Sequence, residues 1–128
     1  MRLLLVEPYS LLARPLQRGL EEEGIVVDTV ANRERADARL HKERYDVILL
    51  DLPAHSGMDA VRTWRSAGLG TPVLILTDPG RDAERNGDLS TDGLDVASKP
   101  FVMDDLLARL RRLATTEDNG QRGVRWQI

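Results

Sequence analysis

Short, continuous apolar runs recur along the chain, and each of them stops at a polar residue. Residues 3–6, 47–50 and 73–76 are all Leu, Val or Ile, and Glu7, Asp51 and Thr77 follow them directly. Runs of this length and composition are typical of parallel strands that are buried on both faces of a sheet. Residues 25–30 and the shorter run 96–98, which stops at Lys99, predict two further strands.

Between these runs, apolar residues recur at helical spacing. The first such segment predicts a helix with Ser10 as its N-cap and Gly24 at its end, and Pro15 is expected to kink it or delay its start. Residues 31–44 predict a polar helix. The loop 52–57 is expected to lead into a third helix, and a leucine stripe predicts a last helix, with stripe residues Met58, Val61, Trp64, Leu106, Leu107, Leu110 and Leu113. Five alternating strand and helix units indicate an α/β fold.

Two segments depart from this rhythm. Residues 78–95 contain few apolar side chains and an internal Asn86-Gly87 pair, so the fourth helix is expected to be short and frayed. We expect one domain over residues 1–114 and a linker or tail over 115–128. Val124, Trp126 and Ile128 alternate with polar residues, and three interpretations stay open: an edge strand, the start of a missing domain, or a disordered end.

Composition narrows the function classes. A chain of 128 residues suits a single domain, and the absence of cysteine excludes disulfides and thiolate metal sites. A net charge of -3 offers no broad surface for nucleic acid. The apolar N-terminal run is too short for a signal peptide or a membrane span. We therefore expect a cytoplasmic protein that makes no direct contact with nucleic acid or membrane through this segment.

The polar residues that end the strands are the candidate site. The carboxyl ends of parallel strands meet at one edge of a sheet, so Glu7, Asp51, Thr77 and Lys99 are expected to lie together. A carboxylate can be phosphorylated where a cation and donors offset the charge of the phosphoryl oxygens. Other interpretations stay open: a structural ion pair between Glu7 and Lys99, Thr77 as an ordinary strand residue, and an ordinary turn at Lys99. His55 is expected to be an exposed loop residue.

Residues 1–7, 45–52, 71–77 and 98–101 together resemble the receiver domain of two-component response regulators. The similarity extends in unbroken order over residues 1 to about 113. Residues 20–24 and 105–111 are most similar to the receivers of OmpR/PhoB-type winged-helix regulators.

This resemblance implies a flavodoxin-like (βα)5 fold, a doubly wound parallel sheet with strand order 2-1-3-4-5. It also implies that a histidine kinase transfers a phosphoryl group to Asp51. Thr77 and Lys99 would contact that group, Glu7 and Asp51 would hold Mg²⁺, and the bond between Lys99 and Pro100 would be cis, which proline makes accessible.

The sequence departs from the family pattern at four points. Pro8 replaces the second metal-binding acid, so we expect weak Mg²⁺ binding. Gly57 follows Asp51 by six residues instead of eight, and Val96 replaces the aromatic switch residue. The last departure is the weakly predicted helix between residues 78 and 95. In relatives of this type this helix is part of the face that forms homodimers, and the residues that match that face here are Arg85, Asp95, Asp105 and Arg109.

Two functions follow as hypotheses. The first is an atypical receiver with weak or no Mg²⁺-dependent phosphorylation that acts through protein contacts with a histidine kinase or another signalling protein. The second is an ordinary phosphoaccepting receiver that controls a C-terminal winged-helix DNA-binding domain. We do not expect an enzyme, because the first turn lacks a glycine-rich phosphate loop and Pro53 stands where an aspartyl-phosphate hydrolase would carry a second acid.

Overall fold

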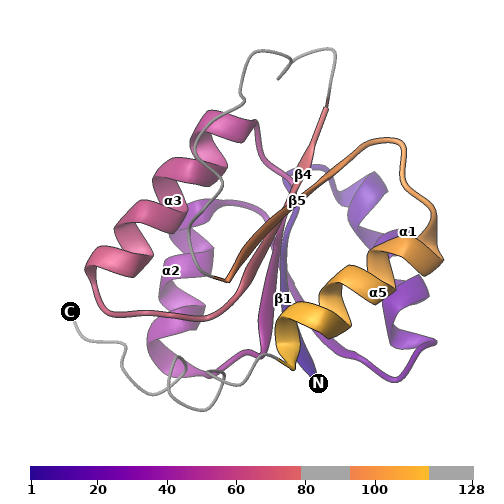
Figure 1. Cartoon of the computed structure of the whole chain (residues 1–128), viewed down its shortest axis with the longest axis horizontal. Coiled ribbons are helices and arrows are strands. Elements are labelled where there is room, and N and C mark those ends of the chain that lie inside the picture. The colour runs from indigo at the N-terminus through magenta and orange to yellow at the C-terminus, as the bar shows by residue number, and fades with distance from the viewer. Residues whose placement is uncertain (79–92, 116–128) are drawn as a thin grey trace.

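The computed structural model describes residues 1–78 and 93–115, and in them a five-stranded parallel sheet lies between two pairs of helices (Figure 1). The strands are β1 (Arg2–Val6), β2 (Val26–Val30), β3 (Val47–Leu50), β4 (Val73–Thr77) and β5 (Leu94–Ser98). The helices are α1 (Ser10–Glu21), α2 (Arg33–Lys42), α3 (Ala54–Ser66) and α5 (Met103–Ala114). The strand order β2-β1-β3-β4-β5 confirms the predicted doubly wound flavodoxin-like fold.

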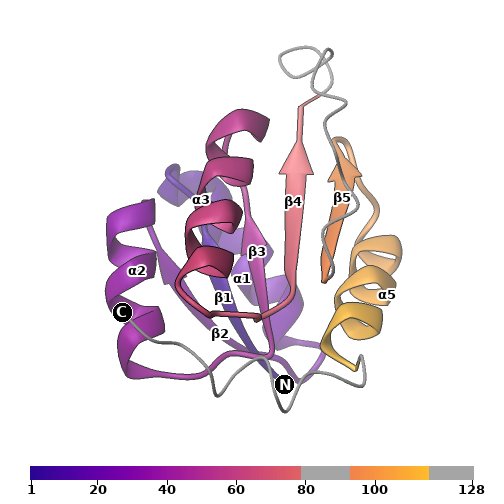
Figure 2. The same ribbon diagram turned by 60° about the vertical axis from the view of Figure 1, so that its left-hand side comes forward.

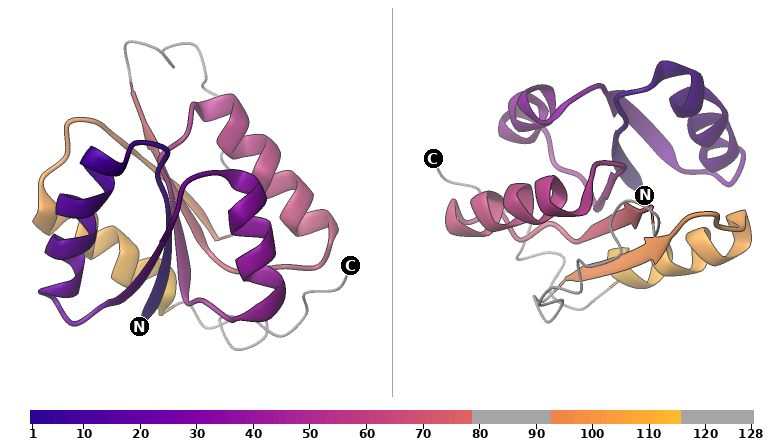
Figure 3. Two further views of the ribbon diagram at one scale, coloured as in Figure 1. Left: turned by 180° about the vertical axis from the view of Figure 1, so that it is seen from behind. Right: turned by 90° about the horizontal axis from the view of Figure 1, so that it is seen from above.

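Each central strand contributes to two cores. In β1, Leu3 and Leu5 pack with the helices α1 and α5, whereas Leu4 and Val6 pack with α2 and α3. Figure 3 shows these helix pairs on opposite faces of the sheet, and Figure 2 shows β5 at its edge beside α5. Burial on both faces explains why these strands are continuous apolar runs.

The start of α1 differs from the prediction. Ser10 was expected to cap the helix, but Tyr9 is the N-cap, and it makes no side-chain capping bond. The helix begins at once at Ser10 and includes Pro15, so a late start is wrong. The backbone N-H groups of Leu12 and Ala13 both donate to the Tyr9 carbonyl, which forms the first turn before the proline is reached.

The predicted loop 52–57 is also wrong, because α3 begins at Ala54. Gly57 is a helical residue whose N-H donates to the Pro53 carbonyl at 2.9 Å. A β-carbon at Gly57 would lie 3.2 Å from Cδ1 of Ile75, so glycine at this position lets α3 pack closely on β4. His55 is exposed as expected, but it lies in α3 and not in a loop.

Several expectations fall on residues 79–92 and 116–128, outside the described part of the chain. They are the frayed fourth helix with Arg85 and the behaviour of the tail after Thr115. The division into a domain of residues 1–114 and a tail therefore stays a prediction. Among the described helices, none has both the length and the apolar character that a membrane span requires.

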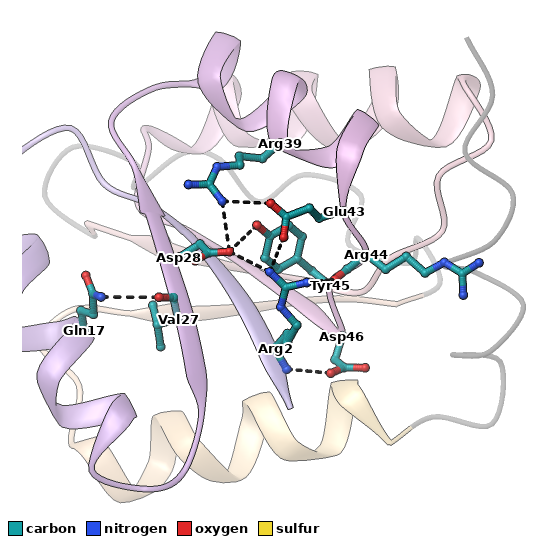
Figure 4. A network of polar contacts seen from close by, with 9 residues as sticks. All are labelled: Arg2, Gln17, Val27, Asp28, Arg39, Glu43, Arg44, Tyr45 and Asp46. Atoms are coloured by element: carbon teal, nitrogen blue, oxygen red, sulfur yellow. Dashed lines mark hydrogen bonds and ion pairs between the residues drawn. The ribbon is translucent and has the colours of Figure 1, made fainter.

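A charged cluster ties α2 to the amino-terminal end of the sheet (Figure 4). The carboxylate of Asp28 accepts a hydrogen bond from the Tyr45 hydroxyl at 2.6 Å and pairs with Arg2 at 3.0 Å and Arg39 at 3.3 Å. Glu43 pairs with the same two arginines. The Tyr45 hydroxyl, followed by Arg39 and Arg2, lowers the pKa of Asp28. The cluster therefore depends on a charged Asp28.

Asp28→Asn tests this dependence. The amide keeps the shape but removes the charge that two arginines and a tyrosine share, so we expect the free energy of unfolding to fall by about 2 kcal/mol. Urea unfolding at neutral pH measures the loss. Asp59→Asn is the matched control, because Asp59 pairs with Arg62 on an exposed surface and its loss should cost less than about 0.5 kcal/mol. If the two variants lose the same free energy of unfolding, the charge of Asp28 does not stabilise the cluster.

Candidate functional site

The backbone of the sheet brings three of the predicted site residues to one edge. Glu7 N donates to the Val30 carbonyl at 3.0 Å, and Asp51 N donates to the Val6 carbonyl at 2.9 Å. Lys99 N donates to the Thr77 carbonyl at 2.8 Å. Each bond continues a parallel ladder by one residue past the end of its strand, so the register of the sheet sets the position of all three side chains.

Lys99 and Asp51 form the central ion pair of this edge. The distance from Nζ of Lys99 to Oδ1 of Asp51 is 2.6 Å, and Asp51 is only 8% exposed. The alternative expectation, an ion pair between Lys99 and Glu7, is wrong, because the salt bridge of Lys99 is with Asp51. The reason lies in the strand order: β3 lies between β1 and β4, and Asp51 therefore lies between the other two residues.

Glu7 is buried beside this pair and is only half satisfied. Its Oε2 accepts a hydrogen bond from Tyr9 N at 3.2 Å, whereas its Oε1 is buried without a hydrogen-bond partner. Burial, followed by a hydrogen bond that only the protonated form can donate to Asp51, raises the pKa of Glu7 to about 7, although the Tyr9 N-H and the charge of Lys99 act in the opposite direction. An uncharged Glu7 is therefore favoured by the fold until a cation or donor reaches it.

Thr77 ends β4 at the same edge of the sheet, but its side chain makes a different contact. It is the last residue of β4, and its hydroxyl donates to the Ala97 carbonyl of the neighbouring strand at 3.4 Å. The hydroxyl is thus engaged by backbone. Its predicted contact with a phosphoryl group stays a prediction, and it requires a rotation of the side chain away from β5.

Glu7, Asp51 and Lys99 form the polar end of a cavity of about 330 Å³. The remaining walls come from α1 and from the segment that joins β5 to α5: Leu12, Pro15, Leu16, Phe101 and Met103. Sequence reasoning did not identify this apolar wall, because it assigned no site role to any of these residues and singled out only Pro15, as a disturbance of the first helix. The peptide bond between Lys99 and Pro100, which precedes Phe101, is cis, the form that the resemblance implies.

The residues present fit a magnesium ion only in part. Mg²⁺ prefers oxygen ligands and is often held by one or two carboxylates with water completing the shell. Glu7 and Asp51 supply two carboxylates, and the unpartnered Oε1 of Glu7 suits a cation. Over residues 1–78 and 93–115, no group of three acidic or histidine side chains could share a metal ion. Pro8, next to Glu7, adds no ligand side chain.

Two more predicted positions lie on the side of β5. Val96 packs against the core shared with α2 and α3, where the family would have its aromatic switch. Arg109 on α5 pairs with Asp95 at 3.1 Å and with Asp105 at 3.3 Å within the same chain. The charges expected on a dimer face therefore neutralise one another in the single chain.

Comparison with known proteins identifies relatives along most of this chain. Residues 3–111 match the family model described as response regulator receiver domain. The response regulator protein PmrA of Pseudomonas aeruginosa is 40% identical over 88% of this chain and 52% of its own length. The two-component response regulator PhoP of the same organism is 39% identical over 88% of this chain and 51% of its own length. The chain thus spans about half the length of these curated relatives.

Solved structures agree. The receiver domain of the sensor histidine kinase PA1611 from Pseudomonas aeruginosa, which has a magnesium ion in its active-site cleft, is 29% identical with a TM-score of 0.75, over 90% of this chain and 98% of that one. A structure of the histidine kinase ThkA in complex with the response regulator TrrA matches with 27% identity and a TM-score of 0.71, over 88% of this chain and 97% of that one.

The raised pKa of Glu7 predicts a fold that loses stability as the pH rises. The stability that protonated Glu7 contributes is fully present below 4.5, the pKa of this carboxyl in the unfolded chain, and is lost as the pH rises through about 7. Glu7→Gln has no charge to bury. Wild type and variant should therefore differ little at about pH 5, whereas at about pH 8 the variant should be more stable by about 2 to 3 kcal/mol.

Urea unfolding across this pH range, with EDTA to remove metal ions, measures the difference. Glu22→Gln is the matched control, because Glu22 is exposed at the end of α1. Its stability should follow that of the wild type at every pH. If the difference in free energy of unfolding between the wild type and Glu7→Gln is the same at every pH, folding does not raise the pKa of Glu7.

Proposed function

The chain belongs to the response regulator receiver family, and from this premise we propose that it is a cytoplasmic, atypical receiver domain of two-component signalling. Its Mg²⁺-dependent phosphorylation is weak or absent, and its output is a contact with another protein. The observation that carries this proposal is the presence of Pro8 beside Glu7, which leaves two carboxylates at the cation site.

The rest of the pocket keeps the parts that phosphoryl transfer requires. An oxygen of the Asp51 carboxylate would form the bond to phosphorus while the bond to the donor's leaving atom breaks. Lys99, 2.6 Å from Asp51, is placed to pair with the new phosphoryl oxygens. Mg²⁺, when bound by Glu7 and Asp51, would neutralise part of the same charge. Loss of even an indirect metal partner typically lowers affinity about 10 to 100-fold, so the missing acid supports weak activity.

The alternative is an ordinary phosphoaccepting receiver that controls a C-terminal winged-helix DNA-binding domain. Two facts support it: the relatives include proteins named as transcriptional regulators, such as TcrA and TctD, and this chain covers about half of their length. The first hypothesis and the alternative differ in whether Asp51 accepts a phosphoryl group efficiently.

A histidine kinase is the partner that we propose for the edge of the sheet that carries Asp51. Four large apolar side chains are exposed there: Tyr9, Leu11, Leu12 and Val102. Leu11 is 87% exposed, and Leu12 also lines the cavity at Asp51. An apolar group of this kind beside a polar site is typical of a protein contact.

A homodimer through β5 and α5 is a further part of the proposal. In such a dimer, the ion pairs that Arg109 makes with Asp95 and Asp105 within one chain would be replaced by ion pairs between two chains. Arg85, the fourth residue expected on this face, lies outside the described residues. Sedimentation equilibrium tests it, and a monomer at every concentration and at low salt excludes it.

Incubation with acetyl phosphate and Mg²⁺ tests the state of the pocket, with intact mass as the measurement. We expect little adduct on the wild type. Pro8→Asp restores a third carboxylate, so labelling and Mg²⁺ affinity should rise about 10-fold or more. Pro8→Asn is the matched control, because it removes the proline ring without adding charge.

The double variant Pro8→Asp with Asp51→Asn should show no adduct, which assigns the modification to Asp51. A stable adduct on the wild type that disappears in Asp51→Asn supports the ordinary receiver instead. In that case Pro8 does not limit the reaction, and the atypical assignment is wrong.

Leu11→Glu tests the kinase contact. A charge in the centre of an apolar contact should weaken binding to the cognate histidine kinase of the host about tenfold or more. Surface plasmon resonance with the histidine kinases of the source organism measures this affinity. Val26→Glu is the matched control, because Val26 is an exposed valine at the opposite end of the sheet. If both variants bind as the wild type does, the kinase contacts another surface.

A further inference from the structure

The cavity above Asp51 has an apolar character that phosphoryl transfer does not explain. Leu16 lies on α1, Met103 lies on α5, and Phe101 precedes α5, and their side chains form walls without a strong hydrogen-bond donor or acceptor. A hydrated Mg²⁺ or phosphoryl group gains nothing from such walls. A volume of about 330 Å³ lies at the lower end of the range for small-molecule sites.

The polar end of the cavity contains an acceptor without a donor. Glu7 is 3% exposed and lines the cavity, and its Oε1 makes no hydrogen bond. A buried polar atom of this kind costs free energy that a matching donor would recover. The last torsion of a glutamate side chain is soft, so a small rotation of the carboxyl group can direct Oε1 toward a ligand.

The charges at this end select the kind of donor. Two carboxyl groups, Glu7 and Asp51, line the cavity with one ammonium group, that of Lys99. The lysine is already paired with Asp51 at 2.6 Å, so Glu7 is the group left without a cation. A positively charged donor therefore complements the site better than a neutral donor, and an anion is disfavoured.

We propose that this cavity binds a small organic ammonium compound whose apolar body contacts Leu16, Phe101 and Met103 and whose ammonium group donates to Glu7. Leu12 also lines the cavity and is 54% exposed, so part of the lining is accessible to solvent beside α1. Binding there does not require phosphorylation. It would cover Asp51 and place a ligand under the surface to which we assign the kinase.

Three probes with the same aromatic body test the proposal: 2-phenylethylammonium, 2-phenylethanol and phenylacetate. Titration of the ¹⁵N-labelled protein in EDTA, followed by NMR, measures each affinity and locates each site. We expect the ammonium compound to bind about tenfold more tightly than the alcohol, phenylacetate to bind most weakly, and the shifts to centre on the residues that line the cavity.

Two variants should change this preference in opposite directions. Glu7→Gln should reduce the affinity for the ammonium compound to that for the alcohol, whereas Lys99→Met should increase it by leaving Asp51 unpaired. Glu7→Gln should change the affinity for the alcohol much less, because the amide keeps the shape of the side chain and an acceptor oxygen. Glu22→Gln, with the same change on an exposed surface, should behave as the wild type.

Equal affinity for the three probes, shifts centred elsewhere, or no binding up to the solubility limit would overturn the proposal. These results are independent of phosphorylation, which the acetyl phosphate assay measures separately. In a separate titration without EDTA, Mg²⁺ should lower the apparent affinity for the ammonium compound if both use Glu7. If Mg²⁺ shifts the same resonances without displacing the compound, Glu7 does not hold the ammonium group.

Discussion

Burial of the central strands on both faces is the constraint on which the rest of this structure depends. β1, β3 and β4 bury Leu, Val and Ile side chains alternately against α1 and α5 and against α2 and α3. Neighbouring parallel strands need crossover connections, which α1, α2 and α3 supply between the first four strands, so these strands run in the same direction and end at one edge. The site is a consequence of that topology, because the polar residues that follow β1, β3 and β5 come to the same edge of the sheet.

The chemistry at that edge is governed by an unequal balance of charge. Asp51 has Lys99 as its partner, whereas Glu7 is buried with one oxygen unsatisfied and a pKa raised to about 7. An additional acid at position 8 would place a third carboxylate beside Glu7 and Asp51, and a bound cation would be required to offset their repulsion. Proline at this position adds no negative charge. The same substitution connects both proposals, since a weak metal site leaves Glu7 available to another positively charged group.

Local sequence signals failed where packing between elements decided the outcome. Gly57 looks like a loop residue because glycine favours turns, but in α3 it allows a close approach to Ile75. Ser10 has a good capping side chain, yet the first turn is closed by the backbone of Tyr9. The pairing of Lys99 with Asp51 instead of Glu7 depends on which strands are neighbours, and no spacing along the chain contains that information.

The sequence by itself determined the α/β class, the approximate position of all five strands and the edge at which Glu7, Asp51 and Lys99 lie. It could do so because burial on both faces leaves a continuous apolar run that ends at a polar residue. Only the tertiary structure decided which carboxylate the lysine neutralises, that the Thr77 hydroxyl is bound to β5, and that residues of α1 and of the segment entering α5 line an apolar cavity beside the site. These features arise from contacts between residues far apart in the chain, and their distances are fixed when the helices pack on the sheet.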